Sequence, residues 1–235
     1  MTFDLSFLGT ALWTAAAKIP ATLALAAVPL ALGTLLGLPL ALARFFRVPV
    51  LGKVIQGAVT LIKGIPVVLM LFVFYVVSAD AFDPLMQSLG LSLTFRDFPK
   101  SLIALAALSI YAAAALCEVF RGALAAVPPG QFDAAAAAGL TRAQVLRRIV
   151  LPQALPVSLP MVSNITIALL KAAAMGSVVA VVDVMNAAVI AANANYRYLE
   201  AYVAAALIYW GLCFALEKAF GAGEKVLTRR VRRAA

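Results

Sequence analysis

Long uninterrupted runs of apolar residues, separated by short groups of charges, divide the chain into segments. The run Ile19–Ala43 contains no charged residue and is long enough to cross a bilayer as a helix. The run Ile149–Leu170 is also uncharged, although prolines interrupt it. Neither run alternates apolar and polar positions as the strands of a membrane barrel do. The pattern therefore predicts membrane-spanning helices, whose backbones satisfy their own hydrogen bonds.

Three further apolar segments can span if a few charges are allowed within them, and they cover about residues 54–79, 101–127 and 201–216. The second span then has to pass Lys63, and the third has to pass Glu118 and Arg121. The outer loop 80–100 is expected to carry a short helix near residues 84–89. One Asp and three Asn residues break the apolar segment 172–196. We expect the end of the fourth span there, followed by an outer loop with short helical pieces, and a sixth full span is the alternative.

Composition supports the same class of protein. Of the 235 residues, 65% are hydrophobic and only 12% are charged, which is about half the usual charged share of soluble domains. The mean hydropathy is +1.03. So much apolar surface cannot be buried in one small core, so lipid is the expected solvent. The sequence predicts an all-α integral membrane protein with five transmembrane helices, forming a single transmembrane domain over residues 1–235.

Lysines and arginines are distributed unevenly among the expected loops. The loop between spans one and two, the loop between spans three and four, and the tail contain Arg44, Arg47, Lys53, Arg142, Arg147, Arg148, Lys218, Lys225, Arg229, Arg230, Arg232 and Arg233. The opposite side contains only Lys18, Arg96, Lys100 and Arg197. Because cytoplasmic loops carry the excess of Lys and Arg, we expect the N-terminus outside and the C-terminus, with the basic tail 221–235, in the cytoplasm. This asymmetry explains the net charge of +9 better than nucleic-acid binding does.

The sequence offers no constellation for catalysis or metal binding. It contains no histidine, the commonest general base and metal ligand, and no nucleophile–base pair is apparent. Cys117 and Cys213 both lie within apolar runs and lack the spacing of a metal site or a disulfide framework. We therefore expect no catalytic residue, no metal and no cofactor. The first cation is Lys18, so we also expect no cleavable signal peptide.

The cytoplasmic loop 128–152 has the pattern of a stiff helical elbow. A Pro-Pro-Gly sequence ends the third span, and Gln131–Ala138, with five consecutive alanines, predicts a short helix of little bulk. Gly139 occupies the position where a helix ends in a left-handed residue. Thr141 and Gln144 fit a capping box that begins the next helix. From these residues alone, docking to a cytoplasmic partner and a simple connector packed on its own bundle are both open.

The loop also carries a long pattern of fixed spacing. An acidic residue and two alanines are followed by three variable residues and then a glycine. Nine further residues separate this glycine from an isoleucine, which is followed by one variable residue, a leucine and a proline. This arrangement resembles the EAA loop of ATP-binding cassette importer permeases, with Asp in place of the more usual Glu. In that family the loop is a coupling helix seated in a cleft of the ATPase. The coupling residues that the resemblance implies are Asp133, Ala134, Ala135, Gly139, Leu140, Arg142, Ile149, Leu151 and Pro152.

Flanking motifs resemble the polar amino acid uptake branch of these permeases over about residues 12–220. They are Lys63-Gly64-Ile65-Pro66, Glu118-Val119-Phe120-Arg121-Gly122-Ala123, Val127-Pro128, Gly130-Gln131 and Leu151-Pro152-Gln153-Ala154. The resemblance implies a bacterial inner-membrane permease that moves a small polar solute, with an amino acid expected. It implies as partners a second permease subunit (another copy or a paralogue), two ATPase subunits and an extracytoplasmic solute-binding protein. The branch usually has Asp or Asn and then Thr-Ser after its lysine, whereas Ala172–Met175 follow Lys171 here, so this wall is less polar.

Several polar residues within the spans are candidates for the solute path. Lys63, Glu118, Arg121, Asn164 and Lys171 are costly facing lipid, so we expect them to face the bundle interior and to pair. Glu118 and Arg121 are three residues apart on one helix, where side chains meet. They form either a structural pair or part of a route for a solute carboxylate. For Lys171, the alternatives are contact with such a carboxylate, snorkelling of the ammonium to the membrane surface, and pairing across a subunit interface.

Two other classes of function stay open from the sequence. An ATP-independent secondary transporter or channel accounts for the charges within the spans but not for the loop spacing. A membrane-embedded enzyme lacks the side chains that the chemistry requires.

Overall fold

The computed structural model describes residues 3–234, which are almost entirely helical. The α-helices are α1 (Leu5–Ala16), α2 (Ile19–Phe45), α3 (Leu51–Gly64), α4 (Val67–Ser88), α5 (Lys100–Ala125), α6 (Pro129–Ala137), α7 (Arg142–Val145), α8 (Leu151–Ala173), α9 (Val184–Ala192) and α10 (Tyr198–Ala234). A π-helical turn, Leu146–Val150, joins α7 to α8, and a 3-10 helix, Ala174–Val179, follows α8. The described residues include no β-strand.

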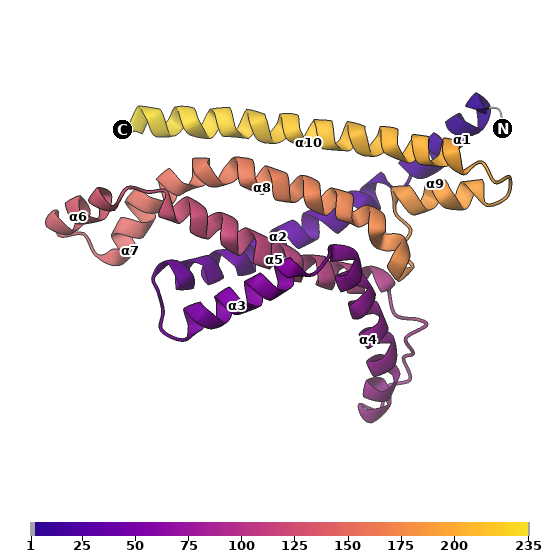
Figure 1. The fold of residues 1–235 in the computed structure, drawn as a ribbon, viewed down its shortest axis with the longest axis horizontal. Helices are drawn as coiled ribbons and strands as arrows, with labels where there is room; N and C mark the ends of the chain where they lie inside the picture. Colours follow the sequence, from indigo (N-terminus) through magenta and orange to yellow (C-terminus); the bar gives the residue numbers. More distant parts are fainter. Residues whose placement is uncertain (1–2, 235) are drawn as a thin grey trace.

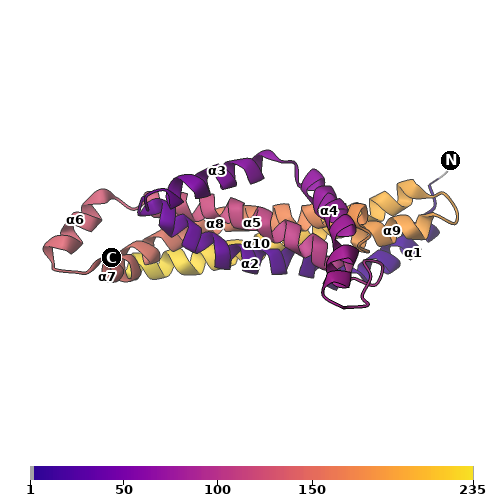
Figure 2. The same ribbon diagram turned by 90° about the horizontal axis from the view of Figure 1, so that it is seen from below.

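The long helices form an elongated bundle. Helices α2, α5, α8 and α10 lie side by side along its length, and α4 leaves the bundle at a steep angle (Figure 1). Helices α6 and α7 lie at one end, near the C-terminus, whereas α1 and α9 lie at the other end, near the N-terminus (Figure 2). The basic tail continues α10, and residue 235 lies outside the described part.

Within residues 3–234, five helical segments are long and apolar enough to cross a membrane. They are Ile19–Phe45, Val67–Ser88, Lys100–Ala125, Arg142–Val179 and Tyr198–Leu227. The five predicted spans are confirmed, and residues 172–196 form short helical pieces rather than a sixth span. Helix α5 is central, since 61% of its most apolar stretch is buried against 11% for α4.

The predicted start of the second span is wrong. That span does not extend back to Val54, because α3 ends at Gly64 and α4 begins only at Val67. Pro66 lacks a backbone N–H and disfavours the helical conformation of the residue before it. Ile65 accordingly adopts φ −92° and ψ 128°, which breaks the helix. The short helix predicted near residues 84–89 is also not separate, because α4 continues through Pro84 to Ser88.

Helices α2 and α5 approach each other at backbone distance. A Cβ added to Gly33 would lie 2.6 Å from the Cβ of Ala112 and 2.8 Å from its carbonyl carbon. A Cβ added to Gly37 would lie 3.0 Å from both the Ala113 carbonyl oxygen and the Cys117 amide nitrogen. Small residues at helix contacts are how membrane helices gain close packing without a hydrophobic driving force. The two glycines therefore determine how closely α2 and α5 approach each other.

A buried polar group joins α2, α9 and α10. The Asp183 side chain is fully buried and caps α9 by accepting from the Asn186 amide at 2.9 Å. Its other oxygen accepts from the Tyr209 hydroxyl at 2.6 Å. The Thr22 hydroxyl oxygen accepts from the Val184 amide at 3.0 Å. Because each polar atom has a partner, the group can be buried without a large desolvation cost.

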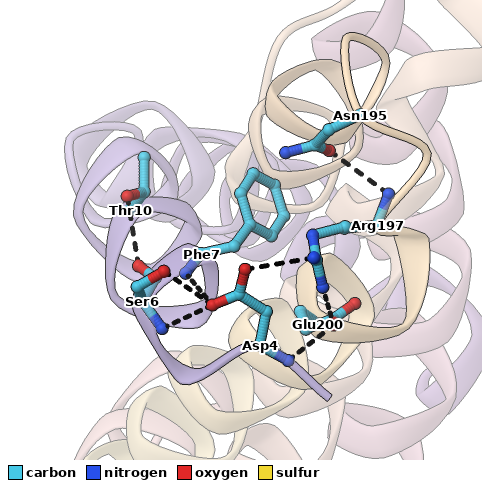
Figure 3. A network of polar contacts seen from close by, with 7 residues as sticks. All are labelled: Asp4, Ser6, Phe7, Thr10, Asn195, Arg197 and Glu200. Atoms are coloured by element: carbon cyan, nitrogen blue, oxygen red, sulfur yellow. Dashed lines mark hydrogen bonds and ion pairs between the residues drawn. The ribbon is translucent and has the colours of Figure 1, made fainter. Parts of the chain in front are cut away.

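A second polar network fastens the N-terminal segment to the start of α10 (Figure 3). The Arg197 guanidinium bridges the carboxylates of Asp4 and Glu200, both at 3.2 Å. The Asp4 amide donates to Glu200 at 2.9 Å. The Asp4 carboxylate also accepts from the hydroxyl of Ser6 and from two backbone amides at the start of α1, and these hydrogen bonds lower the pKa of Asp4. Charge-assisted contacts thus hold α1 against the end of the bundle opposite α6.

Candidate coupling loop and intramembrane charges

Helix α6 ends in the predicted way. Gly139 has φ +74°, the left-handed conformation that glycine adopts without a Cβ penalty. The Leu140 amide donates to the Ala135 carbonyl at 3.1 Å, the backbone bond that closes a Schellman motif. Leu140 and Ala135 belong to the same apolar cluster, which supplies the hydrophobic contact of that motif. The corner of the elbow is therefore defined by both backbone and side-chain contacts.

The next helix begins with the predicted capping box. The Thr141 hydroxyl accepts from the Gln144 amide, and the Thr141 amide donates to the Gln144 side chain at 2.8 Å. Beyond this cap, α7 continues without interruption through the π-helical turn into α8. Pro152 directly follows the π-helical turn, and such a local change of helix type is one way in which a membrane helix accommodates a proline that lacks an N–H. The loop and the fourth span are thus one continuous helical rod.

One face of α6 packs against the bundle, and the other face is exposed. Phe132 and Ala135 face the bundle, where the Phe132 ring lies 6.1 Å from that of Phe45 at the end of α2. Asp133, Ala134 and Gly139 are exposed, as are Arg142 and Pro152, whereas Leu140, Ile149 and Leu151 are half-buried in the same apolar cluster. The exposed face is thin toward the end of α6, where Ala134 and Ala137 present only methyl groups, so another backbone can approach it closely there.

The predicted ion pair in α5 has a third member. Glu118 accepts from Arg121 at 3.0 Å, as the spacing of three residues predicts. Its other oxygen pairs with Arg44 of α2 at 2.5 Å. The Arg44 side chain is only 9% exposed, against 40% for Arg121. Arg44 had the appearance of a loop cation, and its role depends on the α2–α5 crossing, which no local sequence signal reveals.

The other candidate path residues lie apart from this trio. Lys63 is exposed in the last turn of α3. Asn164 and Lys171 are seven residues apart on an exposed face of α8, and Lys171 forms no ion pair within the described side chains. The structure therefore does not pair Lys171 with Glu118, which already holds two arginines.

A groove of about 610 Å³ runs between α8 and α10. Asn164 lines it together with charged residues of α10, namely Glu217, Lys218, Glu224 and Lys225. None of these four forms an ion pair in the described part of the chain. The sequence gives no sign of this groove, because the charged α10 residues have the pattern of the start of a basic tail. Among the described residues, no group of three or more His, Cys, Asp or Glu is arranged to hold a metal ion.

Residues 33–227 match the family model described as binding-protein-dependent transport system inner membrane component. The chain is 32% identical over 224 residues to the L-cystine transport system permease protein TcyL of Bacillus subtilis, covering 95% of this chain and 91% of that protein. It is 34% identical over 212 residues to the histidine/lysine/arginine/ornithine transport system permease protein HisQ of Salmonella typhimurium, covering 87% and 92%. Among solved structures, a chain of an amino acid ABC transporter crystallised with histidines superimposes with a TM-score of 0.81 at 28% identity, covering 96% of this chain and 99% of that one.

Proposed function

The chain belongs to the family of binding-protein-dependent transport system inner membrane components, and from this premise we propose how it works as an ATP-driven importer subunit. It is a multi-pass protein of the inner membrane, and the resemblance to ATP-binding cassette importer permeases is confirmed. We propose that α6 docks on an ATPase subunit and passes the movement of that subunit to the spans. The observation that carries this proposal is the stiff elbow, whose thin exposed helix is continuous with the fourth span.

An amino acid is the proposed solute. Support comes from the relatives, which are named as permeases for cystine and for basic amino acids, and from the amino acid transporter at 28% identity. We propose that Asn164 and Lys171 on α8 contribute to the path, because a cation without a protein partner suits a carboxylate. A second permease subunit would face this side of α8 and complete the path.

The proposed orientation has the N-terminus outside and the C-terminus in the cytoplasm. It is supported by the gathering of the α2–α3 turn, α6, α7 and the end of α10 toward one end of the bundle (Figures 1 and 2). These segments hold most of the lysines and arginines. An extracytoplasmic solute-binding protein would then dock at the opposite end, where α1 and α9 lie.

Co-expression with an ATPase subunit and reconstitution into liposomes test this function. We expect the ATPase subunit to co-purify in fixed stoichiometry and amino acid uptake to require ATP on the ATPase side. An ATP-independent transporter or channel, which the relatives do not support, would instead give uptake without the ATPase. Such uptake would refute the proposed function.

The left-handed Gly139 allows a direct test of the elbow. A non-glycine residue there costs about 1–2 kcal/mol, and a β-branched one more, so Gly139→Val should reduce ATP-driven uptake roughly tenfold or more. Gly139→Asn should retain more activity, because asparagine tolerates this conformation. Gly90→Val is the control, since Gly90 also has a left-handed φ of +70° and open space at its Cβ but lies after α4, outside the coupling loop. Normal solute-stimulated ATP hydrolysis by the Gly139→Val complex would contradict the coupling role.

Lys171 allows a separate test of the path. Lys171→Met keeps the length of the side chain and removes its charge. If Lys171 binds the solute carboxylate, the KM for uptake should rise at least about tenfold, because a hydrogen bond to a charged group contributes about 1.5–3 kcal/mol. Assembly and basal ATP hydrolysis should persist in Lys171→Met. The control Lys18→Met should also leave both properties unchanged. Unchanged uptake kinetics in Lys171→Met would exclude the substrate role, and failed assembly would place Lys171 at a subunit boundary.

A further inference from the structure

Four basic side chains surround a hollow of about 380 Å³ at the turn between α2 and α3. Arg44 and Arg47 come from the end of α2 and the turn, Lys53 from the first turn of α3, and Arg121 from α5. We call this hollow the basic turn pocket. Gln56 and the turn residues 48–50 and 52 complete its lining. The turn between α2 and α3 lies at the same end of the molecule as α6 and the tail of α10 (Figure 1).

The charges of the basic turn pocket are not balanced by the protein. Glu118 is the one carboxylate bonded to the group, and it is shared by Arg44 and Arg121. Four cations against one carboxylate leave an excess of three positive charges. Among the described side chains, Arg47 and Lys53 form no ion pair, and no acidic residue lines the hollow. Because like charges held together repel, an anion in the hollow would stabilise this arrangement.

The rim of the pocket is apolar rather than polar. The turn exposes Val48 at 39%, Val50 at 74% and Leu51 at 49% of their surfaces. The stripe continues along α3 through Val54 and Leu61, which are 62% and 65% exposed. Cations beside exposed aliphatic side chains are typical of a segment that lies at the boundary between headgroups and acyl chains. A small soluble anion would leave this apolar stripe in water, whereas a lipid covers both parts.

We propose that the basic turn pocket binds the phosphodiester headgroup of an anionic phospholipid. The phosphate oxygens accept from Arg47 and Lys53, and an acyl chain lies along Leu51 and Val54. This site lies apart from the exposed face of α6 and from Asn164 and Lys171, although it shares Arg121 with the candidate path residues. Its position gives it a consequence for coupling, because Phe45, between Arg44 and the turn, packs its ring 6.1 Å from Phe132 of α6. Lipid binding therefore steadies the end of α2 against which the coupling helix rests.

The test uses the full chain in a neutral detergent, with bound lipid counted by native mass spectrometry. The probes are dioctanoyl-phosphatidylglycerol, dioctanoyl-phosphatidylcholine and inorganic phosphate. We expect one molecule of the phosphatidylglycerol to bind with clear preference over the other two probes. Each Lys or Arg near an anionic surface contributes about fivefold, so R47Q/K53Q should weaken this binding about thirtyfold. The charge-preserving R47K/K53R should bind normally, which separates loss of charge from loss of fold.

R147Q/R148Q is the matched control, since it also removes two exposed arginines at the same end. Its binding of phosphatidylglycerol should be unchanged. An equal loss of phosphatidylglycerol binding in this control would show that general surface charge attracts the lipid, and it would overturn the proposal. Equal binding of the two lipids would overturn it as well, and tight binding of inorganic phosphate alone would make the pocket a site for soluble oxyanions. A different result would be that the parent chain shows no lipid preference and that R47Q/K53Q no longer retains the ATPase subunit. The pocket would then be a protein-docking surface, and the proposal would fail.

Discussion

Gly33→Leu is expected to abolish the folded protein, and Gly33→Ala to lower its Tm measurably. The alanine methyl would lie 2.6 Å from the Cβ and 2.8 Å from the carbonyl carbon of Ala112, closer than real Cβ contacts occur. The obstructing atoms include backbone, which cannot rotate away. Forcing extra methyl groups into a packed contact costs about 1–3 kcal/mol, and a leucine there would separate α2 from α5. Folded yield by size-exclusion chromatography and Tm in detergent measure the effect.

Gly211→Ala is the matched control for this prediction. Gly211 also lies within a long membrane helix, but an added Cβ has no atom within 4 Å. Alanine favours the helix over glycine by about 1 kcal/mol, so this variant should keep or slightly raise the Tm. If Gly33→Ala and Gly211→Ala behave alike, the close crossing of α2 and α5 does not limit stability.

The features that the sequence predicted correctly depend on neighbours along the chain. A span is recognisable because lipid requires a long apolar stretch, and the elbow because Gly139, Thr141 and Gln144 act within one or two turns. The error at the start of the second span also had a local cause. The apolar run through residues 54–79 outweighed Pro66 in the prediction, although a missing N–H and a restricted preceding residue end α3 there.

The features that the sequence did not predict require the crossing of distant segments. Asp183 breaks the apolar segment 172–196, and the pattern therefore predicts an outer loop there, yet Asp183 is fully buried because Tyr209, 26 residues later, supplies its hydrogen bond. Arg44 seemed to be a loop cation, yet it reaches Glu118, 74 residues away. Side chains of a helix point back toward its N-terminus, so Arg44 can reach up α2 to a carboxylate deeper in α5. Such pairings can be predicted only once it is known how closely α2 and α5 approach each other at the glycine contact.

Glu118→Ala is expected to reduce the folded yield severely. The change leaves Arg44 and Arg121 facing each other without the carboxylate that holds both. Removing one partner of a buried ion pair costs about 3–5 kcal/mol in soluble proteins, because the remaining charge stays desolvated. A protein that is marginally stable loses most of its folded population at such a cost. Folded yield after extraction and Tm are the measurements, with Glu118→Gln as the variant that keeps the shape of the side chain.

Two double variants identify which arginine carries the cost. Arg44 is only 9% exposed, whereas Arg121 is 40% exposed and can extend its guanidinium toward the polar boundary. Glu118→Ala with Arg44→Met should therefore recover more folded protein than Glu118→Ala with Arg121→Met. Equal yields for the single variant and both doubles would show that the three side chains do not act as one group. Since Arg44 also lines the basic turn pocket, the better-recovered double should bind phosphatidylglycerol more weakly than the parent chain, because one of its cations is gone.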